Sequence, residues 1–175
     1  MILYQADCRH IIPMLDYDSV VTDPWYGASS ETDVRKPDDG YAEWCLSWFD
    51  LLKKPIAMTV GKMNFSMWCR IRDFDDALVW HKPDGMEPVL GWGVNLAPDG
   101  KTSWFKTGPE EVDAKGYRAK PLEWAVEMVS RVPGKVLDPF MGKGVVGLAC
   151  KKLGREFIGI EHDPEIFKVA RERLR

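Results

Sequence analysis

The sequence has no long hydrophobic run. Charged residues and prolines interrupt every apolar stretch of its 175 residues, and none approaches the roughly 20 consecutive apolar residues that a membrane-spanning helix needs. No signal-peptide pattern precedes Cys8, so the sequence gives no sign of export. We therefore expect a soluble, cytoplasmic protein with no membrane partner.

Cysteine and histidine are both scarce. The four cysteines show no Cys-x-x-Cys or Cys-x-x-His spacing, and the three histidines are scattered along the chain. Structural zinc, a disulfide-stapled scaffold and a hydrolytic triad are therefore not expected, and no metal site is predicted.

Net charge of either sign is also small. Lys and Arg number 24 against 27 Asp and Glu, which gives a formal charge of -3. The distribution is uneven, because residues 1–50 hold ten acids and three bases while the remainder holds 17 acids and 21 bases. A polyanionic partner such as nucleic acid would therefore meet the later segments.

What is present is an alternation of apolar runs and amphipathic segments. The runs are typical of buried strands, and the segments have helical periodicity. The expected strands are Ile2–Tyr4, Ser19–Thr22, Pro55–Val60, Ala77–Trp80, Lys135–Leu137 and Glu156–Ile160, and the expected helices are 44–52, 124–132, 145–153 and 164–174. This pattern predicts an α/β fold in one domain over residues 1–175, with a mainly parallel sheet and helices on both faces.

Two polar, turn-rich segments interrupt the alternation. Residues 27–40 and residues 97–119 show no apolar period, so both are predicted to be loops. Long loops in a compact domain are often lids or binding loops, and others are plain surface excursions. We take both as candidate substrate loops.

A glycine-rich turn is the clearest nucleotide-binding signal. A strand ending in Asp138 leads into Gly142-x-Gly144-x-x-Gly147 and then a helix, and the next strand ends at Glu161, 23 positions after Asp138. Glycines allow a close approach to a ligand, and an acid at the tip of the next strand can bind ribose hydroxyls. The sequence therefore predicts a nucleoside site.

The chain is too short after this turn for an ordinary dinucleotide fold. Only 28 residues follow Gly147, so the rest of the sheet must come from earlier sequence and the order is permuted. Asp138-Pro139-Phe140 before the glycines also differs from the dinucleotide form. S-adenosylmethionine fits this pattern better than NAD does, and a nicotinamide oxidoreductase is the less favoured reading.

A second turn, Asp23-Pro24-Trp25-Tyr26, follows the strand Ser19–Thr22. Methylation of an exocyclic amine on a base requires acceptors for the amine hydrogens and a surface that holds the base. The Asp23 carboxylate and the Pro24 carbonyl can accept those hydrogens, and Tyr26 can stack on an extruded base. No cysteine follows a proline, so the sequence gives no support to methylation of cytosine C5.

These two turns resemble motifs of one enzyme family. Asp23-Pro24-Trp25-Tyr26 is similar to the Asp-Pro-Pro-Tyr motif of the DNA amino-methyltransferases, and residues 138–144 resemble their Asp-Pro-Phe-x-Gly-Ser-Gly motif. The catalytic motif precedes the cofactor motif, as in the beta group of N6-adenine and N4-cytosine enzymes. The resemblance implies a Rossmann-like class I methyltransferase fold with a circularly permuted motif order and a seven-stranded, mostly parallel sheet whose reversed strand lies at one edge.

The resemblance also assigns residues. It implies catalytic roles for Asp23, Pro24, Trp25 and Tyr26. Tyr4-Gln5-Ala6-Asp7-Cys8 is similar to a segment beside the cofactor's adenine, and Lys120-Pro121-Leu122 to one near its methionine end. The implied S-adenosylmethionine contacts are Asp7, Cys8, Lys120, Pro121, Asp138, Phe140, Met141, Gly142, Lys143, Gly144, Glu161 and His162.

The function implied is S-adenosylmethionine-dependent methylation of a flipped-out DNA base on its exocyclic amine. Adenine N6 is favoured because the acid is Asp23, whereas cytosine-N4 motifs typically carry serine. Three alternatives stay open: an N4-cytosine enzyme, an RNA or small-molecule methyltransferase, and a catalytically silent binding module.

Three positions depart from the family pattern. Trp25 replaces the second proline, and Gly116–Ala119 replaces a His-x-Thr-Gln run before Lys120. Lys143 replaces a serine, where it either contacts the cofactor's carboxylate or is a solvated lysine at the start of a helix. The first two departures affect the base pocket and the methionine contacts.

Little sequence is available for target recognition. About 23 residues separate the last expected strand region from Lys120, so no separate recognition domain is expected. We predict a short or relaxed recognition site, or a homodimer that supplies more DNA surface, as in a phage-like orphan enzyme. Trp92 and Trp104 lie among basic residues in this region and either contact nucleic acid or form a covering hairpin or subunit interface.

Overall fold

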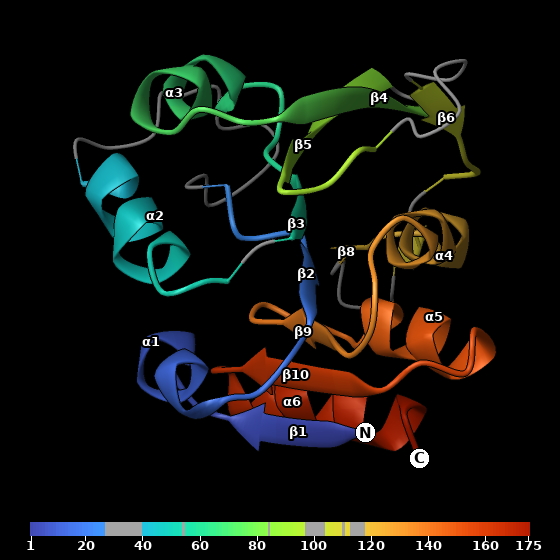
Figure 1. The fold of residues 1–175 in the computed structure, drawn as a ribbon. Helices are drawn as coiled ribbons and strands as arrows, with labels where there is room; N and C mark the ends of the chain where they lie inside the picture. Colours follow the sequence, from blue (N-terminus) through green and yellow to red (C-terminus); the bar gives the residue numbers. More distant parts are fainter. Residues whose placement is uncertain (27–39, 54, 84, 97–103, 110, 113–117) are drawn as a thin grey trace.

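The computed structural model describes residues 1–26, 40–53, 55–83, 85–96, 104–109, 111–112 and 118–175 (Figure 1). An eight-stranded sheet has the order β1-β10-β9-β2-β3-β5-β4-β6. Its strands are β1 (Ile2–Gln5), β2 (Ser19–Thr22), β3 (Ile56–Thr59), β4 (Asp76–Lys82), β5 (Gly85–Trp92), β6 (Trp104–Lys106), β9 (Val136–Asp138) and β10 (Phe157–Glu161). A separate ladder pairs β7 (Glu111–Val112) with β8 (Arg118–Ala119).

One strand of the large sheet is reversed. β1, β10, β9, β2 and β3 are mutually parallel, whereas β5 is antiparallel to both of its neighbours, β3 and β4. β6 extends the sheet parallel to β4. The predicted mostly parallel α/β sheet is therefore confirmed, but it has eight strands instead of seven. The reversed strand is internal because the β4–β5 hairpin places β5 between β3 and β4.

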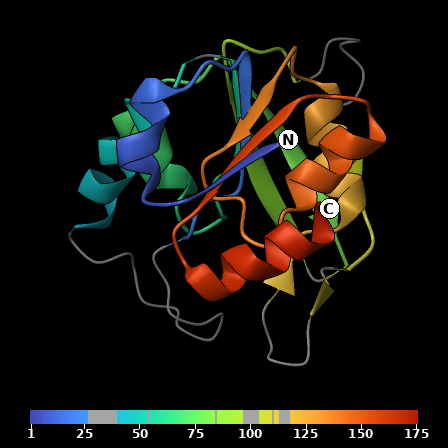
Figure 2. The same ribbon diagram turned by 90° about the horizontal axis from the view of Figure 1, so that it is seen from below.

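Two layers of helices cover the sheet on opposite faces (Figure 2). One layer holds α1 (Cys8–Ile11), the 3-10 turn η1 (Ile12–Met14), α2 (Tyr41–Phe49) and α3 (Phe65–Ile71), and the other holds α4 (Leu122–Ser130), α5 (Val145–Lys152) and α6 (Pro164–Arg173). Alternate strand side chains supply the two cores: Val20 and Leu137 pack with α1–α3, and Val21 and Val136 pack with α4–α6. The hydrophobic runs of the parallel strands reflect this burial on both faces.

All six strands and four helices expected from periodicity are present, with bounds that differ by a few residues. The missed elements are short or contain turn-forming residues. α1 is a single turn of four residues, and β5 contains Pro88 and Gly91 and begins at Gly85. The prediction that residues 97–119 form only a loop is wrong, because β6 adds to the sheet edge and β7 and β8 pair with each other. Of the loop predicted at 27–40, residues 27–39 lie outside the described residues.

The chain leaves neighbouring strands β9 and β2 in opposite directions. From β9 it crosses through α5 to β10, and from β2 it passes through α2 to β3 on the other side. In open α/β sheets a crevice forms at such a switch point, outside the carboxyl ends of the strands. This edge therefore carries the two turns singled out by the sequence.

Within the described ranges, no helix has the length and apolar character to cross a membrane.

Candidate functional site

The ends of β2 and β9 are joined by a buried hydrogen bond. The Thr22 hydroxyl donates to Asp138 Oδ1 at 2.7 Å, and Thr22 is fully buried. Because Asp23 directly follows Thr22, this bond fixes the start of the Asp-Pro-Trp-Tyr turn (residues 23–26) beside the start of the glycine turn (residues 138–144). The two sequence motifs, more than a hundred positions apart, thus meet at one edge of the sheet.

Asp138 is buried among polar partners. It is 2% exposed, and its Oδ1 also accepts the Phe140 amide at 3.1 Å. Burial raises the pKa of this carboxyl to about 7, against the opposing effect of the Thr22 and Phe140 hydrogen bonds, and the charges of Asp23 and Glu161 raise it further. Asp138 therefore changes its charge near neutral pH, where a cationic ligand would favour the ionised form.

The backbone of the glycine turn adopts conformations that favour glycine. Gly142 has φ +50° and Gly144 has φ +81°, both in the left-handed region. A Cβ at Gly142 would meet no atom within 4 Å, whereas one at Gly144 would lie 2.9 Å from Leu174 Cδ1. Gly142 thus faces open space, and Gly144 permits the close packing of α6 against the turn.

Glu161 ends β10 beside the glycine turn. Glu161 is 8% exposed, and its carboxylate accepts the amides of Gly142 at 3.1 Å and Asp163 at 2.9 Å. Nδ1 of the solvent-exposed His162 ring lies 3.2 Å from Glu161 Oε1. The backbone contacts hold this acid at the tip of its strand, which is where the sequence predicts a ribose ligand.

Asp23 has two polar contacts at the carboxyl end of β2. Its Oδ2 lies 3.2 Å from Lys120 Nζ, and its Oδ1 accepts the Tyr26 hydroxyl. The Lys120 ammonium also lies 4.9 Å from the centre of the Trp80 ring and 5.4 Å from that of Tyr26. An amino group is thus held here by one carboxylate and two aromatic rings. Pro121 forms the N-cap of α4.

A cavity of about 180 Å³ joins the two turns. Asp23, Lys120 and residues of the glycine turn all line it. The complete lining is Asp23, Lys120, Trp124, Asp138, Phe140, Met141, Gly142, Lys143, Val145 and Val146. Seven of the predicted site residues therefore share one hollow. Glu161 does not line it, but it binds Gly142, which does.

Asp7 and Cys8 lie at the neighbouring end of β1 and do not line the cavity. The Asp7 carboxylate caps α1 and pairs with Arg9, whose hydrogen bonds lower the pKa of Asp7 to about 2. Cys8 is buried in the core, and burial raises the pKa of its thiol to about 12. The Ala6 amide donates to the Glu161 carbonyl at 3.1 Å, which places this strand end next to that of β10.

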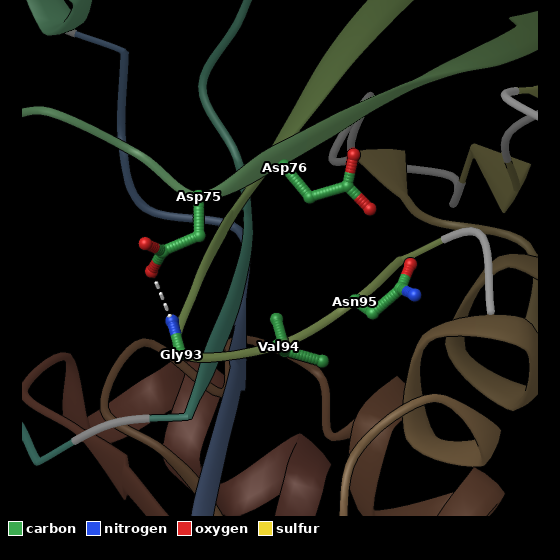
Figure 3. Close-up of a pocket in the computed structure, with 5 residues that line it drawn as sticks. All are labelled: Asp75, Asp76, Gly93, Val94 and Asn95. Atoms are coloured by element: carbon green, nitrogen blue, oxygen red, sulfur yellow. Dashed lines mark hydrogen bonds between the residues drawn. The ribbon is translucent and has the colours of Figure 1, made fainter.

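A larger hollow of about 580 Å³ lies at the amino ends of β3 and β4, away from the two turns. Figure 3 shows its lining residues. It is lined by Asp75, Asp76, Gly93, Val94 and Asn95, and Asp75 Oδ2 accepts the Gly93 amide at 2.5 Å. Its location is fixed by the pairing of Asp76 with Gly91, which in turn pairs with Ala57 early in β3. None of the motif residues lines it, so the smaller cavity is the candidate site.

Sequence reasoning missed three residues around the Asp-Pro-Trp-Tyr turn. Thr22 anchors it to Asp138, and Tyr41 and Asn64 bind its backbone carbonyls. Asn64 follows β3, whose carboxyl end lies at the same edge of the sheet as the turn. That position in the sequence could have identified Asn64 as a candidate site residue. Of the two tryptophans considered for nucleic-acid contact, Trp92 is 1% exposed and donates to the Asp73 carbonyl, so it is a core residue; Trp104 is exposed.

The comparisons with known proteins find similarity to DNA methyltransferases. A family model described as DNA methylase matches residues 119–172. The type II methyltransferase M2.DpnII of Streptococcus pneumoniae is 54% identical over 39 residues, which is 22% of this chain and 15% of that protein. Six such curated relatives are matched over 14% to 29% of their own lengths.

Solved structures match over the whole chain. A crystal structure of an M1.HpyAVI–SAM complex has a TM-score of 0.70 and 25% identity and covers 99% of both chains. The PvuII DNA methyltransferase, described as cytosine-N4-specific, has a TM-score of 0.75 at 17% identity and covers 99% of this chain and 86% of its own. The fold is therefore that of the class I methyltransferases.

Proposed function

We propose that the chain is a DNA amino-methyltransferase of the beta-group type, which transfers a methyl group from S-adenosylmethionine to an exocyclic amine of a DNA base. The DNA methylase model that matches residues 119–172 and the similarity to the M1.HpyAVI–SAM complex support this proposal. The observation that carries the proposal is the Thr22–Asp138 hydrogen bond of 2.7 Å. It places Asp23, the acceptor expected for a target amine, in the same cavity as the glycine turn. A methyl donor held at the glycine turn and a target amine held at the Asp-Pro-Trp-Tyr turn would therefore meet.

The residues present fit S-adenosylmethionine. This cofactor supplies a methyl group on a positively charged sulfur, together with an ammonium group and two ribose hydroxyls. Asp138, whose neutral form is stabilised by burial and by the nearby charges of Asp23 and Glu161, and the carboxylate of Glu161 provide the complementary acids. The open space at Gly142, where a Cβ would meet nothing within 4 Å, lets a ligand approach the backbone.

The remaining predicted contacts surround these acids. Phe140, Met141, Lys143 and Gly144 belong to the glycine turn, Lys120 and Pro121 precede α4, and Asp7, Cys8 and His162 lie at the ends of β1 and β10. We propose that all of these residues except Cys8 bind the cofactor directly, and that the buried Cys8 supports the strand end beside the cofactor.

Asp23 and the Pro24 carbonyl would accept the two hydrogens of the target amine. This would localise the nitrogen lone pair for attack on the methyl carbon that S-adenosylmethionine would supply, with the electrons of the broken carbon–sulfur bond remaining on sulfur. Asp23 would take up the proton lost from nitrogen. Tyr26 would stack on the extruded base, and Trp25 would border its pocket, since its ring is 54% exposed.

Adenine N6 is the target we propose, with cytosine N4 as the alternative. The acid at the first position of the motif is Asp23, which supports adenine. A cytosine-N4-specific enzyme nevertheless shares the fold. The preference therefore rests on one residue, and the assay below distinguishes the two bases.

The test is mass spectrometry of nucleosides from DNA that has been incubated with the protein and deuterium-methyl S-adenosylmethionine. Labelled N6-methyladenine, absent with an Asp23→Ala variant, is the expected result, and labelled N4-methylcytosine would move the target to cytosine. No labelled nucleoside despite measured cofactor binding would reject DNA as substrate and favour RNA, a small acceptor or a silent protein. Tyr26→Ala would then leave turnover on a non-base acceptor almost unchanged.

We also propose that residues 1–175 form one catalytic domain that reads a short or relaxed DNA sequence. The segment between β5 and Lys120 supports this proposal, because its described parts are the short strands β6, β7 and β8. A homodimer would enlarge the DNA surface. Methylation sequencing that showed a long, strictly read site, together with a monomer in light scattering, would contradict this proposal.

A further inference from the structure

The backbone of the Asp-Pro-Trp-Tyr turn is held from outside by two side chains. The Tyr41 hydroxyl donates to the Trp25 carbonyl at 2.6 Å, and Asn64 Nδ2 donates to the Tyr26 carbonyl at 2.9 Å. Nδ2 also lies 3.3 Å from the Tyr41 hydroxyl. Since a backbone carbonyl only accepts, these contacts fix which end of the Asn64 amide faces the turn and account for both of its hydrogens.

Both side chains are buried at helix starts. Tyr41 is 2% exposed at the first residue of α2, and Asn64 is fully buried at the N-cap of α3. Burial raises the pKa of the Tyr41 hydroxyl above its ordinary value, so the hydroxyl keeps its proton and remains a donor at neutral pH. The helices themselves pack on the sheet, so the two donors are fixed relative to β2 and β3.

Ring contacts reinforce the same turn. The Trp25 ring packs edge-on against Tyr41, with ring centres 6.0 Å apart, and against Trp44, at 5.9 Å. Trp44 in turn lies 5.7 Å from Phe140 of the glycine turn. Gly61, at φ +68°, lets the loop after β3 reach the Tyr26 ring, because a Cβ there would lie 3.1 Å from Tyr26 Cγ.

Trp25 lacks the constraint that a proline would give at this position. A proline fixes φ near -65°, whereas a tryptophan leaves φ free, so a turn with one proline needs another source of rigidity. We propose that Tyr41 and Asn64 are positioning residues that supply this rigidity by holding the Trp25 and Tyr26 carbonyls. They thereby set Asp23, the Pro24 carbonyl and the Tyr26 ring for the target amine. This inference rests on the proposed function.

The test uses Tyr41→Phe, which keeps the ring contact with Trp25 and removes only the hydroxyl. The matched control is Tyr17→Phe. Tyr17 is 6% exposed, its hydroxyl accepts the Lys53 amide at 2.9 Å, and it precedes β2 at the opposite end of that strand. Each variant removes the hydroxyl of a buried tyrosine: that of Tyr41 contacts the Trp25 carbonyl and Asn64, and that of Tyr17 contacts the Lys53 amide. A general loss of stability would therefore affect both variants.

Single-turnover methyl transfer should slow by about tenfold or more in Tyr41→Phe and in Asn64→Ala, since small misplacements of reacting groups have effects of this size. Cofactor Kd and the KM for DNA should stay within about threefold. Hydrogen exchange in the peptide covering residues 20–26 should accelerate in both variants. Tyr17→Phe should change neither the rate nor that exchange.

Rates within twofold of Tyr17→Phe, with unchanged exchange in residues 20–26, would overturn the proposal. If the unaltered protein transfers no methyl group to DNA, the proposed function fails, but the exchange measurement still tests whether Tyr41 and Asn64 hold the turn. Faster exchange of residues 20–26 in Tyr41→Phe but not in Tyr17→Phe would then support that role, and unchanged exchange in Tyr41→Phe would reject it. Should Asn64→Ala fail to fold, Tyr41→Phe carries the test.

Discussion

Lys120 holds the acid of the Asp-Pro-Trp-Tyr turn: its Nζ lies 3.2 Å from Asp23 Oδ2, with the Lys120 side chain 10% exposed and that of Asp23 24% exposed. Tyr26 donates to the other carboxylate oxygen. A target amine that binds Asp23 would therefore share this carboxylate with Lys120 and Tyr26 or replace one of them. The Lys120 ammonium occupies one of the acceptor sites that a substrate nitrogen could use.

A double-mutant cycle tests this pair. Asp23→Ala should lower the free energy of unfolding by about 1–2 kcal/mol, because it leaves the Lys120 ammonium largely buried without that carboxylate. Adding Lys120→Met should recover part of the loss. Urea denaturation of the two single variants and the double variant measures the coupling, and strictly additive effects would show that the contact contributes nothing to stability.

The raised pKa of Asp138 predicts a pH dependence of stability. With a folded pKa of about 7 against an ordinary value of 3.8, the folded protein keeps a proton that the unfolded chain releases. Stability should therefore fall as pH rises from about 4 to about 7, by at most about 1.4 kcal/mol per pH unit, and this contribution should be constant above pH 7. In Asp138→Asn, which keeps an acceptor for Thr22 and Phe140, this slope should disappear in urea titrations.

The same ionisation predicts a pH dependence of binding. A cationic ligand prefers the ionised form of Asp138, so the affinity for S-adenosylmethionine should rise between about pH 6 and pH 8, by up to about tenfold. Isothermal titration at several pH values measures this, and Asp138→Asn should bind more weakly with a flat profile. Identical pH profiles in the two proteins would show that Asp138 does not face the cofactor's positive charge.

Two glycines form a matched pair for the glycine turn. Gly142 has φ +50° and Gly154 has φ +65°, and a Cβ at either position meets no atom within 4 Å. Alanine should therefore cost about 1–2 kcal/mol of stability at both from backbone strain alone. Only Gly142→Ala should weaken S-adenosylmethionine binding, by about tenfold or more, because only Gly142 faces the cavity. Equal binding by the two variants would remove Gly142 from the cofactor site.

Glu161 is predicted to bind the cofactor's ribose. Glu161→Gln keeps one oxygen for the Gly142 or Asp163 amide but loses the second acceptor and the charge. The S-adenosylmethionine Kd should rise by about tenfold, the size of one charge-assisted hydrogen bond. Glu165→Gln, at an exposed position in the first turn of α6, is the control and should bind normally.

The sequence predicts the parts of this fold that local pattern and chain order determine. The parallel strands are apolar throughout because both faces are buried, and the glycine turn is legible from Gly142 and Gly144 because their backbone conformations require glycine. The sequence analysis did not predict β5, because Pro88 and Gly91 are typical of turns and the pairing of this strand with β3 and β4 depends on tertiary structure. Its position inside the sheet has no local signal.

The site divides in the same way. Asp23, Asp138 and Glu161 could be predicted as site residues because the motif chemistry requires acids there, and the structure places all three at neighbouring strand ends. Thr22, Tyr41 and Asn64 act through hydrogen bonds with residues 16 to 116 positions away, and no spacing rule identifies such partners. The Lys120–Asp23 ion pair likewise depends on how α4 approaches β2.

The register of β1 with β10 has a consequence for biosynthesis. Ile2 pairs with Ile158, so the ribosome adds roughly 150 residues after β1 before β10, its neighbour in the described sheet, exists. Glu161 and Leu174, which complete the glycine turn, are made later still. The nascent chain therefore holds an unpaired β1 and an incomplete turn until these residues have been made. β1 joins the sheet only after synthesis has passed β10, and its unpaired edge is a site for chaperone binding in that interval.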